Sequence, residues 1–232
     1  MRTYKRINED YLDSIDRSEY TDELSLNVDT NVDMLLRGKT PNIDFNLIQE
    51  PIYKVVDETF LKTLIKKCTD MYGYDCNLNW IDVSQIETMS YLFSGDNNSF
   101  IGDISKWDVS HVIRMNNMFY SSLFNGDISR WDVSSVRNMG CMFQSAKFNN
   151  DISKWNVSNV TIMYGMFLFS DFNKDISKWN TSKVKDMSQM FKGSEFNGDI
   201  SRWSVRSVTQ NHNMFVRCPL ETQPEKQPKF KT

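Results

Sequence analysis

Hydrophobic positions recur along the second half of the chain with a period of 24 residues. Tryptophan occupies positions 107, 131, 155, 179 and 203, and each Trp stands in a phrase such as ISRWDVSSVRNMGCMF, which begins at Ile128. Five copies in one register are not a chance event. An internal repeat of this length is typical of an elongated fold in which successive units stack on one another.

The apolar positions within one unit predict its local structure. Trp131 and Val133 are two residues apart, as on one face of a strand, whereas Met139, Met142 and Phe143 follow the spacing of a short helix. This pattern predicts a leucine-rich-repeat-like α/β repeat solenoid of about six 24-residue strand–short-helix coils. The predicted core positions are Trp107, Trp131, Trp155, Trp179, Trp203, Met139, Met163 and Met187.

The segments on either side of the repeats differ in composition. Apolar residues at helical spacing predict a helix over 55–71, with Asp57 as its N-cap and Gly73 as its stop, which covers the first coil. A membrane-surface helix is the alternative, since three lysines lie on its other face. The predicted organisation is an acidic arm over 1–50, a capping helix over 51–75, the solenoid over 76–218 and a disordered tail over 219–232. The arm packs along the solenoid or docks on another chain.

The charge and composition exclude several classes of protein. The chain has 27 Lys/Arg and 30 Asp/Glu, so its net charge of −3 does not favour nucleic acid as a partner. No apolar run is long enough to cross a bilayer, and the start, MRTYKRINEDYLDSID, lacks the apolar stretch of a signal peptide and any lipobox. We therefore expect no membrane insertion, and a cytoplasmic or virion-associated location rather than Sec-dependent export. The four cysteines have no C-x-x-C spacing and are expected to be thiols, with a Cys68–Cys76 disulfide as the alternative.

The sequence contains no pattern typical of an active site. Motifs for a nucleophile, a phosphate loop or a zinc site are missing, and His111 and His212 fall about four coils apart. The repeated Asn-x-Asp of each unit, such as Asn125 and Asp127, suits a turn, with a calcium site as the alternative. We expect no enzyme activity, no cofactor, no bound metal and no small-molecule ligand.

Two surfaces are candidates for binding another protein. The first is a column of cations beside the tryptophans. The acidic residues next to these cations are replaced by neutral ones toward the C-terminus, and the candidates for binding an acidic partner there are Lys154, Lys178 and Arg202. A merely solvated face is the alternative. The second is the surface that differs from unit to unit, with the candidate anchors Tyr120, Leu123, Leu168 and Phe169. These four side chains equally suit gap filling between coils.

The phrase FNGDISRWDVSSVRNMGCMF resembles the repeats of the BspA-like leucine-rich-repeat surface proteins and of the mycoplasma-lipoprotein-like family. The resemblance covers roughly residues 61–215. It implies a leucine-rich-repeat-like solenoid in proteins that are often exposed on surfaces, serve adhesion or protein contact, and also occur in phage and large-virus genomes. The expected function is non-enzymatic protein–protein interaction. The alternatives are a structural subunit of a phage or virus particle that assembles through residues 1–50, and a surface adhesin for host protein or glycan.

Overall fold

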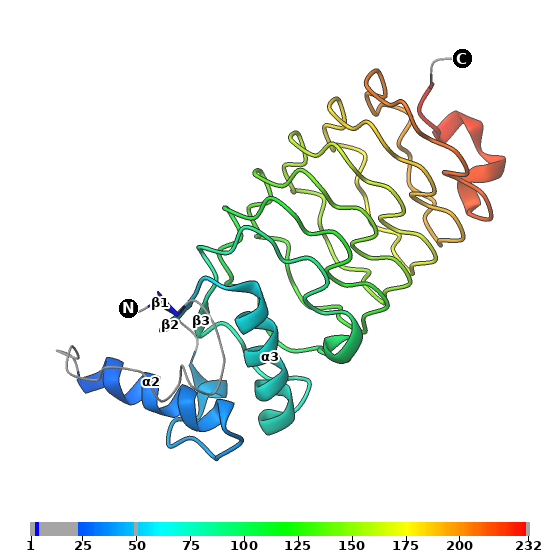
Figure 1. The fold of residues 1–232 in the computed structure, drawn as a ribbon. Coiled ribbons are helices and arrows are strands. Elements are labelled where there is room, and N and C mark those ends of the chain that lie inside the picture. The colour runs from blue at the N-terminus through cyan, green and yellow to red at the C-terminus, as the bar shows by residue number, and fades with distance from the viewer. Residues whose placement is uncertain (1–2, 5–22, 49–50, 231–232) are drawn as a thin grey trace.

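The repeats form successive coils that stack along one axis (Figure 1). The computed structural model describes residues 3–4, 23–48 and 51–230. Single parallel β-bridges join one residue of each coil to its equivalent in the next coil, and the residues in this column are Thr88, Arg114, Asn138, Ile162, Asp186 and Gln210. The 24-residue period is therefore the length of one turn of the backbone around the stack.

Backbone hydrogen bonds of the Met-x-x-Met-Phe segment run in one direction along the stack. The N–H groups of Met139, Cys141 and Phe143 donate to carbonyl oxygens of the following coil at 3.0, 2.7 and 2.9 Å. Elsewhere in the coil the direction is reversed, since the N–H groups of Arg137 and Lys147 donate to the preceding coil at 2.9 and 3.0 Å. This one segment therefore presents its donors toward the C-terminal end of the stack.

The local structure of each coil differs from the strand and helix that the apolar spacing predicts. The segment around Trp131 consists of turns, and the β-bridge lies instead at Asn138, directly before the first Met. The Met-x-x-Met-Phe segment is also a turn, because Cys141 and Ser145 both have φ of 55°. A left-handed residue interrupts the right-handed helix, so the spacing of three, three and one reflects a tight corner of the coil.

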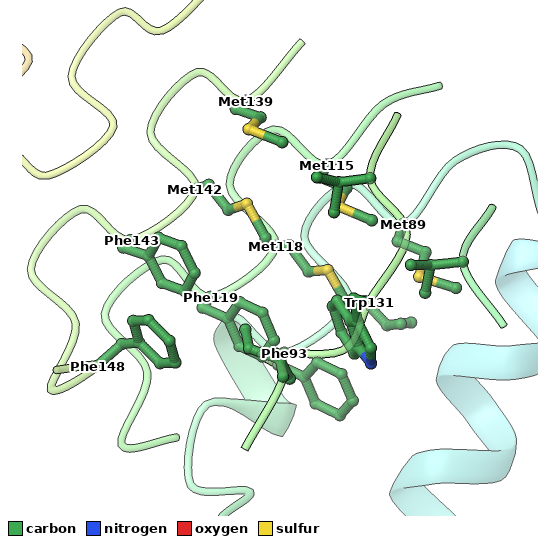
Figure 2. Packing of buried hydrophobic residues seen from close by; sticks show 14 of the residues in the cluster. Met89, Phe93, Met115, Met118, Phe119, Trp131, Met139, Met142, Phe143 and Phe148 are labelled. Atoms are coloured by element: carbon green, nitrogen blue, oxygen red, sulfur yellow. The ribbon is translucent and has the colours of Figure 1, made fainter. Parts of the chain in front are cut away.

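The interior of the stack is filled by columns of identical side chains (Figure 2). The five repeat tryptophans are each only 4% exposed, and Met139, Met163 and Met187 are fully buried. Phe143 stacks on Phe119 and Phe167 of the neighbouring coils, with ring centroids 5.4 and 5.8 Å apart and almost parallel planes. One coil exposes this apolar layer on both sides, so its burial requires the coils above and below.

A small helical region covers the N-terminal end of the stack. Helix α3, Glu58–Tyr72, starts at the N-cap Asp57, whose carboxylate accepts the Phe60 N–H at 2.7 Å, and stops at Gly73 with φ of 92°. Its apolar face joins the core of the coils. The other helical elements of this region are helix α2, Glu23–Leu36, and the 3₁₀ helices η2, Phe45–Leu47, and η3, Gly95–Asn97. A parallel sheet of order β1-β2-β3 consists of the strands Thr3–Tyr4, Tyr53–Val55 and Ile81–Asp82.

Part of the acidic arm packs on its own chain. The ring of Phe45 stacks on Trp80 with centroids 4.1 Å apart, and Val28, Val32 and Leu35 of α2 are buried in the common core. Residues 28–48 therefore extend the cap of the first coil. The acidic residues between 5 and 22, on which the docking hypothesis mainly rests, lie outside the described residues.

The C-terminal tail corrects the expectation of disorder. Residues 219–226 form the 3₁₀ helices η4, Pro219–Thr222, and η5, Pro224–Lys226. Leu220 is fully buried, and the backbone N–H of Ile200 donates to the Lys226 carbonyl at 3.0 Å. The prolines and lysines suggested a polar, unstructured end, but the apolar Leu220 and Phe230 hold the tail against the last coil.

Candidate functional site

Large apolar side chains are exposed at few positions of the described chain, and three of them lie on adjacent coils. The exposed set is Leu47, Tyr74, Tyr91, Ile101, Tyr120, Leu123, Ile162 and Phe169. Tyr74, Ile101 and Leu123 are 51%, 52% and 51% exposed. The N–H of Ile101 donates to the Tyr74 carbonyl and that of Leu123 to the Asn98 carbonyl, both at 2.8 Å. We call Tyr74, Ile101 and Leu123 the apolar strip.

Ile101 interrupts a column of asparagines. In the later coils the Oδ1 atom of each Asn at this position accepts the backbone N–H of the next Asn, and the column is Asn125, Asn149, Asn173 and Asn197, with distances of 2.8–2.9 Å. Ile101 occupies the first position and has no acceptor in its side chain. The N–H of Asn125 accordingly donates to no group within the described part of the chain. The first coil thus replaces a stabilising hydrogen bond with an exposed apolar side chain.

The position of Leu123 is charged in the coils that follow. Its equivalents are Lys147, Asp171 and Glu195, and the Lys147 ammonium lies 3.0 Å from the Asp171 carboxylate. The flank of the stack is therefore apolar at the N-terminal coils and charged further along. This limits the apolar strip to one end of the molecule, where the capping helix α3 also lies.

The four candidate anchors of the sequence analysis lie in different environments. Tyr120 and Phe169 are 38% and 50% exposed, as an anchor requires, and Leu123 belongs to the apolar strip. Leu168 is only 6% exposed and fills the space between coils, so it is not an anchor. Phe169 lies against Gly193 of the next coil, where an added Cβ would be 2.3 Å from the ring.

The cation column is exposed, and each cation has an acidic neighbour in its own coil. Lys154, Lys178 and Arg202 each follow an aspartate by three residues, and their attraction contributes to lowering the pKa of Asp151, Asp175 and Asp199. Binding of an acidic partner by this column stays a prediction.

The change from Asp to Asn beside the tryptophans has a structural explanation. Asp132 accepts the Ser134 backbone N–H at 3.0 Å, and Asn156 accepts the equivalent Ser158 N–H at 3.2 Å. Either side chain closes the turn, so the fading of negative charge along this column does not indicate a binding surface.

The repeated aspartates are also turn residues. Asp151 accepts the Ser153 N–H at 2.8 Å, and hydrogen bonds from Ser153 are the main cause of the lowered pKa of this carboxyl. No group of three or more His, Cys, Asp or Glu that can hold a metal ion occurs among the described residues. A turn therefore accounts for the aspartate column without calcium.

The thiols and imidazoles do not converge on a reactive centre. Burial raises the pKa of Cys68, and burial together with the nearby Asp75 raises the pKa of Cys76 to about 12. All four cysteines are free thiols. His111 contacts Ser110, and His212 contacts Ser188 at 3.0 Å, in different coils. Across the described ranges, no helix has the length and apolar character needed to span a membrane.

The comparisons with known proteins agree with the repeat phrase. A family model described as Mycoplasma protein of unknown function, DUF285, matches residues 59–169 and again residues 144–227. No curated protein and no solved structure matches the chain. The two matches together span the capping helix, the coils and most of the tail. The chain therefore belongs to this family of unknown function, DUF285.

Proposed function

We propose that the chain is a non-enzymatic module that binds another protein, and that its stacked coils are a leucine-rich-repeat-like solenoid that presents the binding surface. The observation that supports this most strongly is Ile101. A stack of this kind gains a hydrogen bond wherever asparagine stands at this position, yet the first position carries an exposed isoleucine. An apolar side chain in place of a stabilising group suits a contact with a partner.

The composition of the apolar strip favours a protein as its partner. One aromatic ring and two aliphatic side chains offer apolar area, which suits an apolar contact with a protein. Protein interfaces combine such an apolar centre with a polar rim. Lys147 and Asp171 follow on the same flank and mark the position at which the apolar surface ends. Tyr120 lies three residues before Leu123 on the same coil and extends the surface.

The docked-subunit alternative gains no support from the described part of the arm. Residues 28–48 cover the first coil of their own chain, and Asn46 accepts the Asn77 backbone N–H through its side chain at 2.7 Å. Residues 28–48 therefore contribute to the stability of their own chain.

A photo-cross-linking residue placed at position 123 tests the proposal. The cross-linker goes into the full chain, which is irradiated in an extract of its native source, and adducts are identified by mass spectrometry. Position 147 is the matched control, because it occupies the same place in the next coil. We expect one protein adduct at a fixed ratio from position 123 and much less from position 147. Equal, heterogeneous labelling from both positions would refute a specific protein site at the apolar strip.

A further inference from the structure

The last coil ends in a row of unused backbone donors. In the preceding coil three alternate N–H groups donate to the last coil at 2.8, 2.9 and 3.0 Å, and these belong to Met187, Gln189 and Phe191. The equivalent groups of the last coil have no acceptor within the described residues, and these belong to Asn211, Asn213 and Phe215. The direction of the hydrogen bonds in this segment makes residues 211–215 a donor edge.

The tail covers only one part of this end. Its backbone pairs with Ile200 through the Lys226 carbonyl, and Gln223 and Lys226 reach the last asparagine of the column, Asn197, at 2.8 and 3.2 Å. The segment 209–213 is exposed, whereas its equivalents Met187 and Ser188 in the coil before are buried. The tail therefore protects the tryptophan side of the coil and leaves the donor edge open.

A hollow with a basic rim lies on the same coil, a few residues before the donor edge. Its volume is about 360 Å³, and its lining includes Arg202, Trp203, Val205, Arg206 and Lys229. The three cations at its rim are exposed, while the ring of Trp203 and the side chain of Val205 lie beneath them. Such a hollow takes a side chain that is partly apolar and next to a negative charge.

The charges of the described residues are separated along the stack. Residues 172–230 contain ten Lys/Arg and six Asp/Glu, while residues 23–48 and 51–100 together contain six Lys/Arg and eleven Asp/Glu. The end that carries the donor edge is therefore basic. An approaching acidic chain is attracted to this end and repelled from the other.

We propose that the C-terminal edge, residues 209–215, binds an acidic segment of a partner protein that continues the stack. The carbonyl oxygens of that segment accept the three free N–H groups as the next coil does within the stack, and its acidic side chains are attracted by Arg202, Arg206 and Lys229. Main-chain hydrogen bonds supply affinity at such an edge, whereas the charges select the sequence. The half-buried Val208 and Phe215 add apolar contact at the same place.

Two synthetic peptides test this site on the full chain. One alternates glutamate and valine over twelve residues, and the other alternates lysine and valine, so the two differ only in the sign of their charge. Backbone amide exchange is followed by NMR at each peptide concentration. We expect the acidic peptide to slow exchange at Asn211, Asn213 and Phe215 at least tenfold, and the basic peptide to leave these amides unchanged.

A charge-reversed variant, Arg206→Glu with Lys229→Glu, provides the matched control, because both side chains are exposed and neither forms an ion pair with another described residue. It should unfold like the wild type and bind the acidic peptide at least tenfold more weakly. Exchange at the three amides that is unaffected by the acidic peptide at millimolar concentration would overturn the proposal. Slow exchange at these amides without peptide, accompanied by dimers in sedimentation, would also overturn it and assign the edge to a second copy. The apolar strip plays no part in this experiment, so its failure leaves the proposed function intact.

Discussion

The indole N–H of Trp155 donates to the backbone carbonyl of Ile128, one coil earlier, at 3.0 Å. The same bond joins Trp131 to Ile104, Trp179 to Ile152 and Trp203 to Ile176. The tryptophan column therefore does more than fill volume. Each ring fixes the register of its own coil against the preceding one, because a slip by one residue removes the bond from a buried site.

Replacement of Trp155 by phenylalanine should destabilise the stack by about 1–3 kcal/mol, through the lost hydrogen bond and the smaller ring. Urea unfolding followed by circular dichroism measures the change. Tyr164→Phe is the control, since Tyr164 is half-buried and its hydroxyl forms no hydrogen bond with another described residue. An unfolding midpoint equal to that of the wild type would show that the indole bond does not hold the register.

Met163→Asp should abolish the cooperative unfolding of the repeat region. Met163 is fully buried in the middle of the stack, where a carboxylate has no partner, and burial of an unpaired charge costs several kcal/mol. Met163→Leu, which keeps the volume, should cost less than about 1.5 kcal/mol. Thermal melting of both variants measures the difference, and a Met163→Asp melt like that of the wild type would mean that the methionine column is not the core.

Ser145→Gly should stabilise the protein by up to about 1 kcal/mol. Ser145 has φ of 55°, a conformation that costs an ordinary residue about 1–2 kcal/mol and glycine almost nothing. Glycine also raises the conformational entropy of the unfolded chain, which offsets part of this gain. Ser135→Gly, at a position without positive φ, should instead destabilise it by about 0.5–1 kcal/mol. Denaturant midpoints compare the two variants, and the same sign of change for both would contradict this account of the corner.

The stability of the stack should decrease below about pH 4. Hydrogen bonds from Ser129, Ser153 and Ser177 lower the pKa of Asp127, Asp151 and Asp175 in the folded protein, so these carboxyls remain ionised to lower pH than in the unfolded chain. Their stabilising contribution is present above the unfolded pKa and is lost as the pH falls through the folded one.

The triple variant Asp127→Asn, Asp151→Asn, Asp175→Asn tests this origin of the pH dependence. Asparagine closes a turn of the same kind elsewhere in the coil, at Asn156 and Asn180, so the fold should survive at neutral pH. The variant should show a smaller decrease of its melting temperature between pH 5 and pH 3 than the wild type. Identical decreases would assign the acid sensitivity to other carboxyls.

The sequence predicts the period, the buried tryptophans and methionines, and the ends of α3, since each depends on residue types at fixed spacing. It does not predict the corners, because the spacing of Met139, Met142 and Phe143 fits both a helical turn and a corner with two left-handed residues. The residues between the paired methionines indicate the corner, since Asn117 and Gly165 belong to the types that tolerate positive φ.

The apolar strip was only partly predicted. Leu123 differs from its equivalents and therefore stands out, but Ile101 falls in a link of the first unit, where the repeat is irregular. The exchange at Ile101 is recognised only from the asparagine column, in which the side chain at this position accepts the backbone N–H of the next coil. Leu168 also differs from its equivalents, and burial rather than identity separates it from a surface anchor.

The most direct test of a binding role is the affinity of the captured partner for the wild type and for Ile101→Asn. Asparagine at this position extends the hydrogen-bonded column to the Asn125 N–H, so the variant should be at least as stable as the wild type. It also removes the central apolar side chain of the strip. We predict an affinity at least tenfold weaker, with an unchanged or higher unfolding midpoint. An unchanged affinity would contradict the proposal that the apolar strip is the binding surface.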